Sequence, residues 1–282
     1  MRRRNVCPLL FCLLPAFAVL FACEALASAG SSLVAVNEVP GPVRELEPAG
    51  TLGSRPYYTV NLKKTGRKGL PDIQFTYPSV GVTSVDRDIA LWAQHIASSF
   101  ERDFASQAFA AESSQPAWDP KSASSFLSAS YTMLSASDDV VSIVFSLWMG
   151  TTHESFIGSI DGHPYMEQSY SEDVLTLNYN LRTGQRLHLV DMFEKVDVAL
   201  DILSSQSRQA LAKSVGRGHV DAVILKGTTP EPENYASLAL TRDGIRVYFQ
   251  PYQVSSLAGS QYVNIALEAL LDAGPMLSLW GR

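Results

Sequence analysis

The 282-residue sequence predicts an α+β fold, in which mixed or antiparallel sheets of hairpins are packed by a long N-terminal helix and by a second helix in the C-terminal half. The segment 174–194 carries the clearest strand signal, because Leu175, Leu177 and Tyr179 alternate with polar residues. A three-residue loop ending at Gly184 then turns the chain back into a second strand. We therefore expect a hairpin with one apolar face and one polar face.

Two segments show helical periodicity. In Thr83–Ala111, apolar residues recur every three or four positions and form one continuous stripe, made of Val85, Ile89, Trp92, Ile96, Phe100 and Phe104. Val196–Val215 repeats this spacing more weakly, and Gly216 follows it as a helix-ending residue. Both segments are predicted to be helices that cover sheet faces.

Shorter apolar or alternating runs predict the remaining strands. The chain contains a hairpin signal at Asp243-Gly244, a turn pair that favours two-residue loops. Strands are expected at Tyr57–Lys64, Asp72–Tyr77, Ser125–Ser135, Val140–Gly150, Ala236–Thr241, Ile245–Gln250 and from Tyr262 onward. The nearly continuous apolar character of Val140–Gly150 places that strand in the middle of a sheet.

The predicted domain organisation has four parts. Residues 1–27 form an export signal, and residues 28–54 form a linker because they contain Gly, Pro, Ser and Glu without periodicity. A small N-terminal α+β domain is expected at 55–150 and a C-terminal α+β domain at 151–282. Within the latter, Thr151–Glu172 is polar and aromatic, with two glycines and a proline, and we expect it to be a long loop.

The N-terminus has the layout of a secretory signal, with Arg2–Arg4 followed by an apolar run over Val6–Ala22. Two cleavage interpretations compete, since Ala25-Leu26-Ala27 fits ordinary signal peptidase and Leu20–Cys23 resembles a lipobox, which ends the signal at residue 22. A retained anchor helix is the third alternative. We expect an exported protein, periplasmic or anchored to the envelope, that contacts the membrane only through a lipid on Cys23.

The composition and net charge of the chain limit the classes of partner that it is expected to bind. The chain is 46% hydrophobic and 18% charged, which is typical of a packed core rather than of disorder. Its net charge of −6 argues against a nucleic-acid partner, which requires a basic surface, and favours a basic protein or a cationic ligand. All three cysteines lie in the predicted signal, so the mature body has no disulfide and thiol catalysis is excluded once the signal is removed.

The loop around residues 153–163 holds the densest group of metal-binding or acid–base side chains, His153, Glu154, Asp161 and His163. The spacing does not match H-E-x-x-H, and no cofactor motif is present. Three interpretations stay open: a metal or catalytic site, a ligand-contacting loop formed by Glu154, Asp161, His163 and Tyr165, or a purely structural loop. His95 and His188 are expected at the surface.

The aromatic residues near this loop also allow two interpretations. Phe156, Tyr165 and Tyr170, together with Trp148, could line a groove for a glycan or a protein. Ordinary packing of a sheet explains them equally well.

Three stretches resemble the C-terminal domain shared by RsiV-type extracytoplasmic anti-sigma factors and PdaC-like peptidoglycan deacetylases. They are Asp161-Gly162-His163-Pro164, the segment 177–193 (LNYNLRTGQRLHLVDMF) and the segment 238–265 (LALTRDGIRVYFQPYQVSSLAGSQYVNI). Tyr57–Gln107 resembles the smaller companion domain that precedes it, so the likeness covers about residues 55–275. The resemblance implies an α+β fold outside the cytoplasm and a binding role, since anti-sigma members bind lysozyme through this region.

The chain departs from these families at both ends. Five residues precede the apolar segment, and no TFDDGP-like deacetylase motif follows the C-terminal region. We therefore expect the binding region alone, a non-enzymatic module of the bacterial envelope that binds lysozyme or cell-wall glycan. The alternative is a metal-assisted hydrolase that acts on cell-wall material through the His153–His163 loop.

Overall fold

The computed structural model describes residues 45–52, 55–66, 70–114, 124–160, 163–256 and 259–282, all of which belong to one unit, Pro42–Arg282. For Glu45, residues 105–114, Ser124 and residues 151–169, the description covers the backbone only. The predicted export signal and most of the predicted linker lie outside the described residues.

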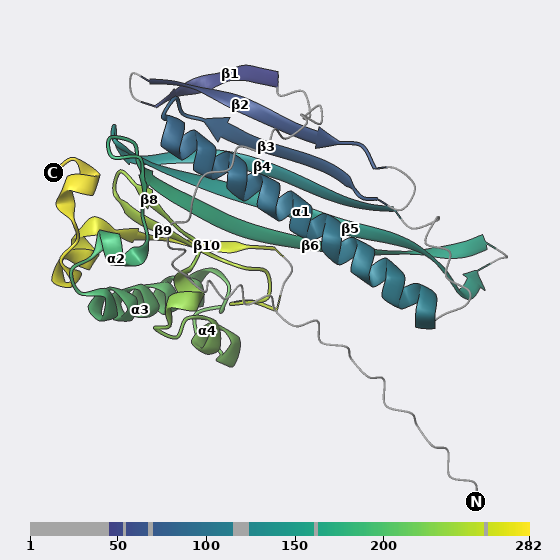
Figure 1. The fold of residues 1–282 in the computed structure, drawn as a ribbon. Helices are drawn as coiled ribbons and strands as arrows, with labels where there is room; N and C mark the ends of the chain where they lie inside the picture. Colours follow the sequence, from purple (N-terminus) through teal and green to yellow (C-terminus); the bar gives the residue numbers. More distant parts are fainter. Residues whose placement is uncertain (1–44, 53–54, 67–69, 115–123, 161–162, 257–258) are drawn as a thin grey trace, which may run out of the picture. The chain divides into compact units, whose positions relative to one another are not determined.

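A seven-stranded sheet organises the chain, with its strands in sequence order from β1 to β7 (Figure 1). All neighbours are antiparallel except β3 and β4, which are parallel and are connected through helix α1 (Thr83–Ser114). The strands are β1 (Glu45–Leu52), β2 (Arg55–Lys64), β3 (Asp72–Ser79), β4 (Ser124–Ser137), β5 (Val140–Ile160), β6 (His163–Asn180) and β7 (Gln185–Arg186).

Helix α1 covers one face of this sheet, because its apolar stripe matches the apolar face of the strands. The ring of Trp92 packs against Phe145 and Phe75, with centroids 4.5 and 5.7 Å away. Leu177 is 1% exposed in this core, as the alternation of β6 predicted. Tyr179 beside it is fully buried, and its hydroxyl donates a 2.6 Å hydrogen bond to Asp88 of α1.

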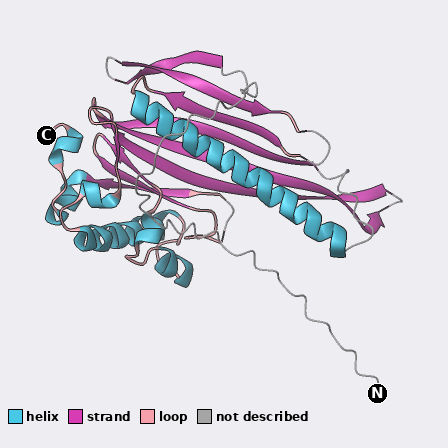
Figure 2. Cartoon of the chain, in the orientation of Figure 1, coloured by secondary structure: helices cyan, strands magenta, loops and turns pink. Residues whose placement is uncertain are grey.

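A second, three-stranded antiparallel sheet lies in the C-terminal part, with strand order β10-β9-β8. The strands are β8 (Leu238–Thr241), β9 (Gly244–Phe249) and β10 (Gln261–Ala266). The helices around it are α2 (Leu189–Met192), α3 (Val196–Ser214), α4 (Ala222–Gly227) and three short 3₁₀ turns, Pro232–Tyr235, Leu267–Ala273 and Leu277–Trp280 (Figure 2).

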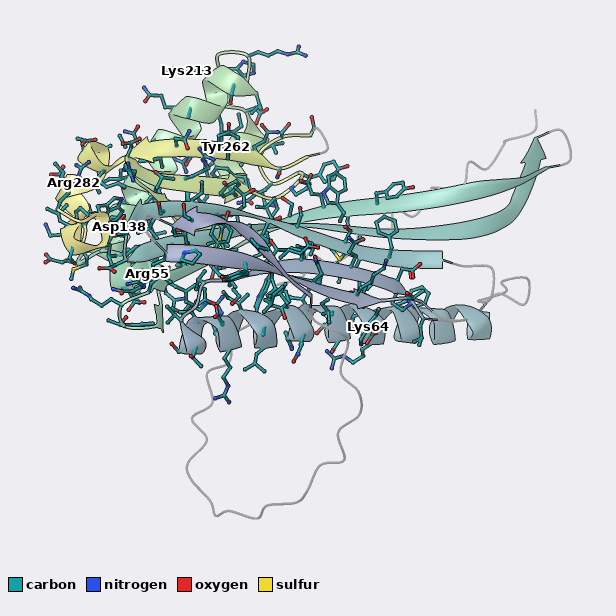
Figure 3. The ribbon with its side chains drawn as sticks, turned by 90° about the horizontal axis from the view of Figure 1, so that it is seen from above. Arg55, Lys64, Asp138, Lys213, Tyr262 and Arg282 are labelled. Atoms are coloured by element: carbon teal, nitrogen blue, oxygen red, sulfur yellow. The ribbon has the colours of Figure 1, made fainter. Side chains whose placement is uncertain are left out.

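The apolar side of α3 and the small sheet form a separate core that includes Leu203, Leu211, Val247 and Phe249. Tyr235 closes this core and donates a 3.0 Å hydrogen bond to the carbonyl oxygen of Thr228, and burial raises the pKa of Tyr235 to about 12. Seen from above, the layers follow one another as α1, large sheet, small sheet and α3 (Figure 3). The predicted α+β class, with one long and one C-terminal helix, is confirmed.

Two segments differ from the expectation. Strand β1 lies inside the predicted linker; it is exposed and contains Pro48 and a bulge before Gly50, so it has no hydrophobic alternation to detect. The prediction of a loop at Thr151–Glu172 is wrong for most of that segment, because β5 and β6 remain paired as far as Ile160 and His163. The domain division at residue 150 stays a prediction, and β5 runs through that residue.

Candidate functional site

The residues proposed from the sequence fall on the distal part of the β5–β6 hairpin, which Figure 1 shows extending beyond the other strands. In the backbone register, Glu154 pairs with Met166, Ser155 with Tyr165 and Ile160 with His163. Asp161 lies outside the described residues, as do the side chains of Glu154, His163 and Tyr165. Their role in ligand binding therefore stays a prediction.

The histidines with described side chains do not form a site. His95, His188 and His219 are each exposed, and they lie on α1, at the start of α2 and after α3. The backbone N–H of His188 donates a 2.8 Å hydrogen bond to Asp191, so this histidine begins a helical turn. Among the described residues, no three His, Cys, Asp or Glu side chains are close enough to hold a metal ion.

On the face of the large sheet opposite α1, buried polar side chains form hydrogen bonds to the small sheet. We call this group of hydrogen bonds the polar junction. The hydroxyl of Ser142 on β5 donates to the Oδ1 atom of Asn178 on β6 at 2.5 Å. The amide of Asn178 donates to the carbonyl oxygen of Leu238 at 3.0 Å, and the N–H of Leu240 donates to Ser142 Oγ at 2.8 Å. These bonds satisfy backbone groups of β8 on the side where no strand pairs with it.

A second group of bonds extends the junction along β6. The side-chain amide of Gln250 accepts the N–H of Val174 at 2.9 Å and donates to its carbonyl oxygen at 2.6 Å. The hydroxyl of Ser237 donates to the same carbonyl at 2.7 Å. Val144 and Val174 are buried beside these groups, against Ala239 of β8. The small sheet is therefore held in one register on the large one.

Beyond the junction the same face is open and aromatic. Trp148 and Tyr170 are 48% and 59% exposed, and they alternate with residues that pack toward α1. Gly150 lies opposite both Phe126 and Tyr170, whose ring centroids are 6.2 Å apart. A Cβ atom at Gly150 would come within 2.7 Å of Phe126 and 3.0 Å of Tyr170, so the two rings meet where this glycine leaves space.

We call Phe126, Trp148, Tyr170 and Glu172 the open aromatic face. Glu172 pairs with Trp148 across the strands and accepts a 3.3 Å hydrogen bond from the hydroxyl of Ser260, which precedes β10. This bond connects the open aromatic face to the end of the small sheet. The face thus combines exposed rings and a carboxylate, with the hydroxyl of Ser260 beside them.

The small sheet adds an aromatic pair. Tyr262 of β10 is 58% exposed and lies 6.1 Å, centroid to centroid, from its cross-strand partner Tyr248 (Figure 3 labels Tyr262). The guanidinium of Arg246 lies 4.8 Å from the ring of Tyr262, and its Nε atom donates to Asn264 at 2.7 Å. Tyr262 therefore has both an aromatic and a cationic neighbour beside its ring.

The pKa of one carboxyl group near this region is shifted from its ordinary value. Asp173 follows Glu172 on β6 but pairs with Leu147, which belongs to the core under α1. Burial raises the pKa of Asp173, and the neighbouring charge of Glu172 raises it further. The carboxyl group therefore lowers the stability of the fold when it is ionised.

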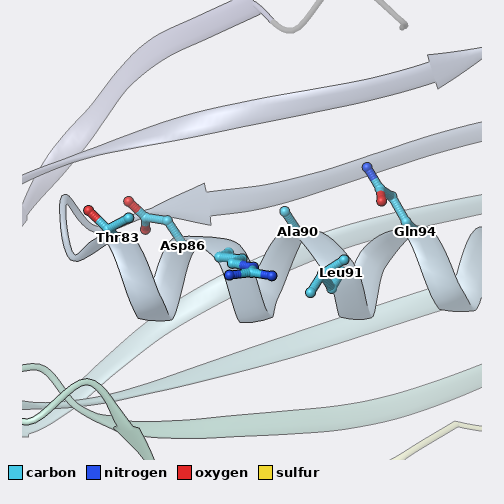
Figure 4. A pocket seen from close by; sticks show the side chains of 6 residues that line it. Thr83, Asp86, Ala90, Leu91 and Gln94 are labelled. Atoms are coloured by element: carbon cyan, nitrogen blue, oxygen red, sulfur yellow. The ribbon is translucent and has the colours of Figure 1, made fainter. Parts of the chain in front are cut away.

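Helix α1 carries a shallow hollow on its outer side, lined by Thr83, Asp86, Arg87, Ala90, Leu91 and Gln94 (Figure 4). All of these residues come from one helix, so no groups converge on it from different elements. Asp86 has a structural role, because it accepts hydrogen bonds from Ser79 and from the backbone of Val80 and Gly81. This hollow is not a candidate site.

The sequence indicated Trp148 and Tyr170 as possible groove residues and Glu172 as one of the acidic residues beside the predicted binding loop, but it missed Phe126 and Ser260. The sequence did not pair Glu172 with Trp148, although the alternation of β5 and β6 is consistent with that position. Phe126 and Ser260 required the sheet order and the docking of the small sheet. The helices in the described ranges include none that is long and apolar enough to cross a membrane.

Comparisons with known proteins match parts of the chain. Residues 190–268 match a family model described as "Protein of unknown function (DUF3298)". Over 147 residues the chain is 27% identical to the peptidoglycan-N-acetylmuramic acid deacetylase PdaC of Bacillus subtilis (strain 168). That match covers 52% of this chain and 28% of the relative. A distant likeness to PdaC is thereby found, whereas the likeness to RsiV-type anti-sigma factors stays a prediction.

Two crystal structures of DUF3298 family members resemble the fold. One, from Bacteroides fragilis, has a TM-score of 0.46 and 14% identity, and the match covers 80% of this chain and 96% of that chain. The other, from Pseudomonas aeruginosa PAO1, has a TM-score of 0.48 and 17% identity, and the match covers 79% and 95%.

Proposed function

We propose that this chain is a non-enzymatic binding module of the bacterial cell envelope, and that its open aromatic face binds glycan strands of peptidoglycan. The observation that carries the proposal is the exposure of Trp148 and Tyr170 on neighbouring strands of one sheet face. Exposed aromatic side chains grouped in this way mark interaction surfaces on soluble domains. The predicted export signal supports a location in the envelope.

An extended polysaccharide suits the shape and chemistry of this surface. Aromatic rings offer flat apolar surfaces to the C–H faces of sugars, and Glu172 and Ser260 offer hydrogen-bond groups to hydroxyls beside them. An open strand face accepts a polymer along its length, whereas small ligands are usually enclosed in pockets. The name of the PdaC relative supports peptidoglycan as the class of polymer.

A basic protein such as lysozyme is the second candidate partner. The net charge of −6 and the carboxylate Glu172 favour it electrostatically, together with Glu154 and Asp161, which the sequence analysis included. Exposed Trp and Tyr residues are also common at the centre of protein interfaces. Binding of a basic protein would weaken strongly with salt, whereas glycan binding through stacked rings would not.

Co-sedimentation of purified protein with insoluble peptidoglycan tests the glycan proposal. Trp148→Ala and Tyr170→Ala should each weaken binding about tenfold or more, in the range of interface hot spots. Gly150→Ala keeps the rings of Phe126 and Tyr170 but displaces them, and it should weaken binding as well. Leu91→Ala on α1 is the matched control, because it removes a similarly exposed apolar side chain from the opposite side.

Unchanged binding of the Trp148→Ala protein, with an unchanged unfolding midpoint, would refute the glycan surface. Salt-sensitive capture of lysozyme without retention by peptidoglycan would favour the second candidate. Stoichiometric zinc in the purified protein, with hydrolysis of peptidoglycan fragments lost in His163→Ala, would instead support the metal-assisted hydrolase.

A further inference from the structure

A second hollow lies at the end of the two sheets, and its lining shares no residue with the open aromatic face. Its volume is about 530 Å³, which is within the range of small-molecule sites. Ser137, Asp138 and Asp139 line it from the β4–β5 turn, Arg182 from the β6–β7 turn and Arg242 from the β8–β9 turn. We call it the turn pocket, and Figure 3 shows Asp138 at this end of the sheets, near Arg282.

The walls of the turn pocket are fixed by bonds between these turns. The N–H of Leu181 donates a 2.7 Å hydrogen bond to the carbonyl oxygen of Asp139, which joins the first two turns. The indole N–H of Trp280 donates to the carbonyl oxygens of Thr241 and Gly244, at 3.1 and 3.3 Å. Trp280 is buried, so the C-terminal turn forms a firm apolar wall beside the third turn.

The polar groups in the turn pocket are incompletely paired. Asp139 lies 3.6 Å from Arg55, but within the described ranges Arg182, Arg242 and Asp138 form no ion pair. The hydroxyl of Ser137 is buried and has no hydrogen-bond partner there. A ligand in the hollow cannot reach that hydroxyl, whereas the charged groups of Arg182, Arg242 and Asp138 are exposed to it.

The turn pocket is therefore lined by both carboxylates and guanidinium groups. A guanidinium binds a carboxylate through two parallel N–H···O bonds, so Arg182 and Arg242 offer a site for a carboxylate. A simple anion would also face the carboxylate of Asp138, which repels it. An ammonium group on the same ligand removes that repulsion, because it can donate to Asp138.

We propose that the turn pocket binds a small zwitterion, the free carboxylate and ammonium groups of an amino acid or a short peptide. Arg182 and Arg242 hold the carboxylate, and Asp138 holds the ammonium group. Trp280 contacts the apolar part of the ligand. This site involves none of the residues of the open aromatic face and does not depend on glycan binding.

Calorimetric titration of the purified chain with alanyl-alanine, in its L,L and D,D forms, tests the proposal. One form at least should bind saturably at millimolar concentration, and the N-acetylated and C-amidated dipeptides should bind about tenfold more weakly or not at all. Arg182→Gln and Arg242→Gln should each weaken binding at least tenfold. Asp138→Asn should weaken binding of the free dipeptide and leave the acetylated one unchanged.

Arg87→Gln on α1 is the matched control, since it removes an exposed arginine that does not line the turn pocket. Trp148→Ala should also leave dipeptide binding unchanged, so a failure of the glycan proposal is separable from a failure of this one. Thermal melts establish that each variant is folded. No saturable binding of either dipeptide, or equal binding of the free and blocked forms, would overturn the proposal.

Discussion

The two faces of the seven-stranded sheet differ in how they are covered. The face under α1 is a continuous apolar core, in which Phe75, Phe145 and Leu177 are buried without hydrogen-bonding needs. The opposite face is divided between a buried polar junction and the open aromatic face. Apolar packing tolerates small shifts, whereas hydrogen bonds require fixed geometry. The first face therefore supplies stability, and the second determines how the small sheet is placed.

The largest effect is expected on the apolar face. Leu177→Ala removes a side chain that is 1% exposed and leaves a cavity, which should lower the free energy of unfolding by about 2–5 kcal/mol. The shift of the midpoint in urea denaturation measures this loss, provided that the slope of the unfolding free energy against urea concentration is unchanged. A loss below about 0.5 kcal/mol would mean that the two faces do not differ in the way described.

A smaller effect is expected at the polar junction. Asn178→Ala leaves the carbonyl oxygen of Leu238 and the hydroxyl of Ser142 without their partners, which should cost about 1–3 kcal/mol. Ser142→Ala likewise leaves the N–H of Leu240 without its hydrogen-bond acceptor. Because the two side chains form one network, a double-mutant cycle should show coupling of about 0.5 kcal/mol or more. Additive losses would show that Ser142 and Asn178 act independently.

The smallest effect concerns Asp173, whose pKa is raised in the folded protein by burial and by Glu172. Between its unfolded and folded pKa values the native state binds more protons, so stability is lost as the pH rises through this window. Asp173→Asn should therefore be more stable than the parent at neutral pH. The difference should vanish below the ordinary pKa of 3.8, and unfolding midpoints across that range measure it. A variant that is less stable at neutral pH would show that the charged carboxyl has a favourable partner.

The periodicity of apolar residues predicted the helices and strands that bury only one of their faces. The stripe of α1 and the alternation of Leu175, Leu177 and Tyr179 gave correct helix and strand positions, because each faces a single core. The hairpin beyond Gly150 was missed, since its sequence lacks alternation and contains turn residues. Strand β1 was missed because pairing with β2 alone requires no hydrophobic pattern.

The junction could not be foreseen for a different reason. Ser142 and Asn178 occupy the polar face of alternating strands, which predicts exposure to solvent, yet both are buried by the small sheet. Only the tertiary arrangement brings the edge of β8 over them. The same applies to the open aromatic face, where Trp148 and Tyr170 were visible in the sequence but Phe126 reaches Tyr170 only because Gly150 lies between them.

The bonds from Ser142 and Asn178 to β8 also have a consequence for self-association. A strand at the border of a sheet offers unpaired N–H and C=O groups to any passing extended chain, and this is a common start of aggregation. In β8 the groups of Leu238 and Leu240 are already occupied by side chains of the same molecule. A foreign strand would first have to displace two buried hydrogen bonds, so this border is shielded without a proline or a charged residue in the strand.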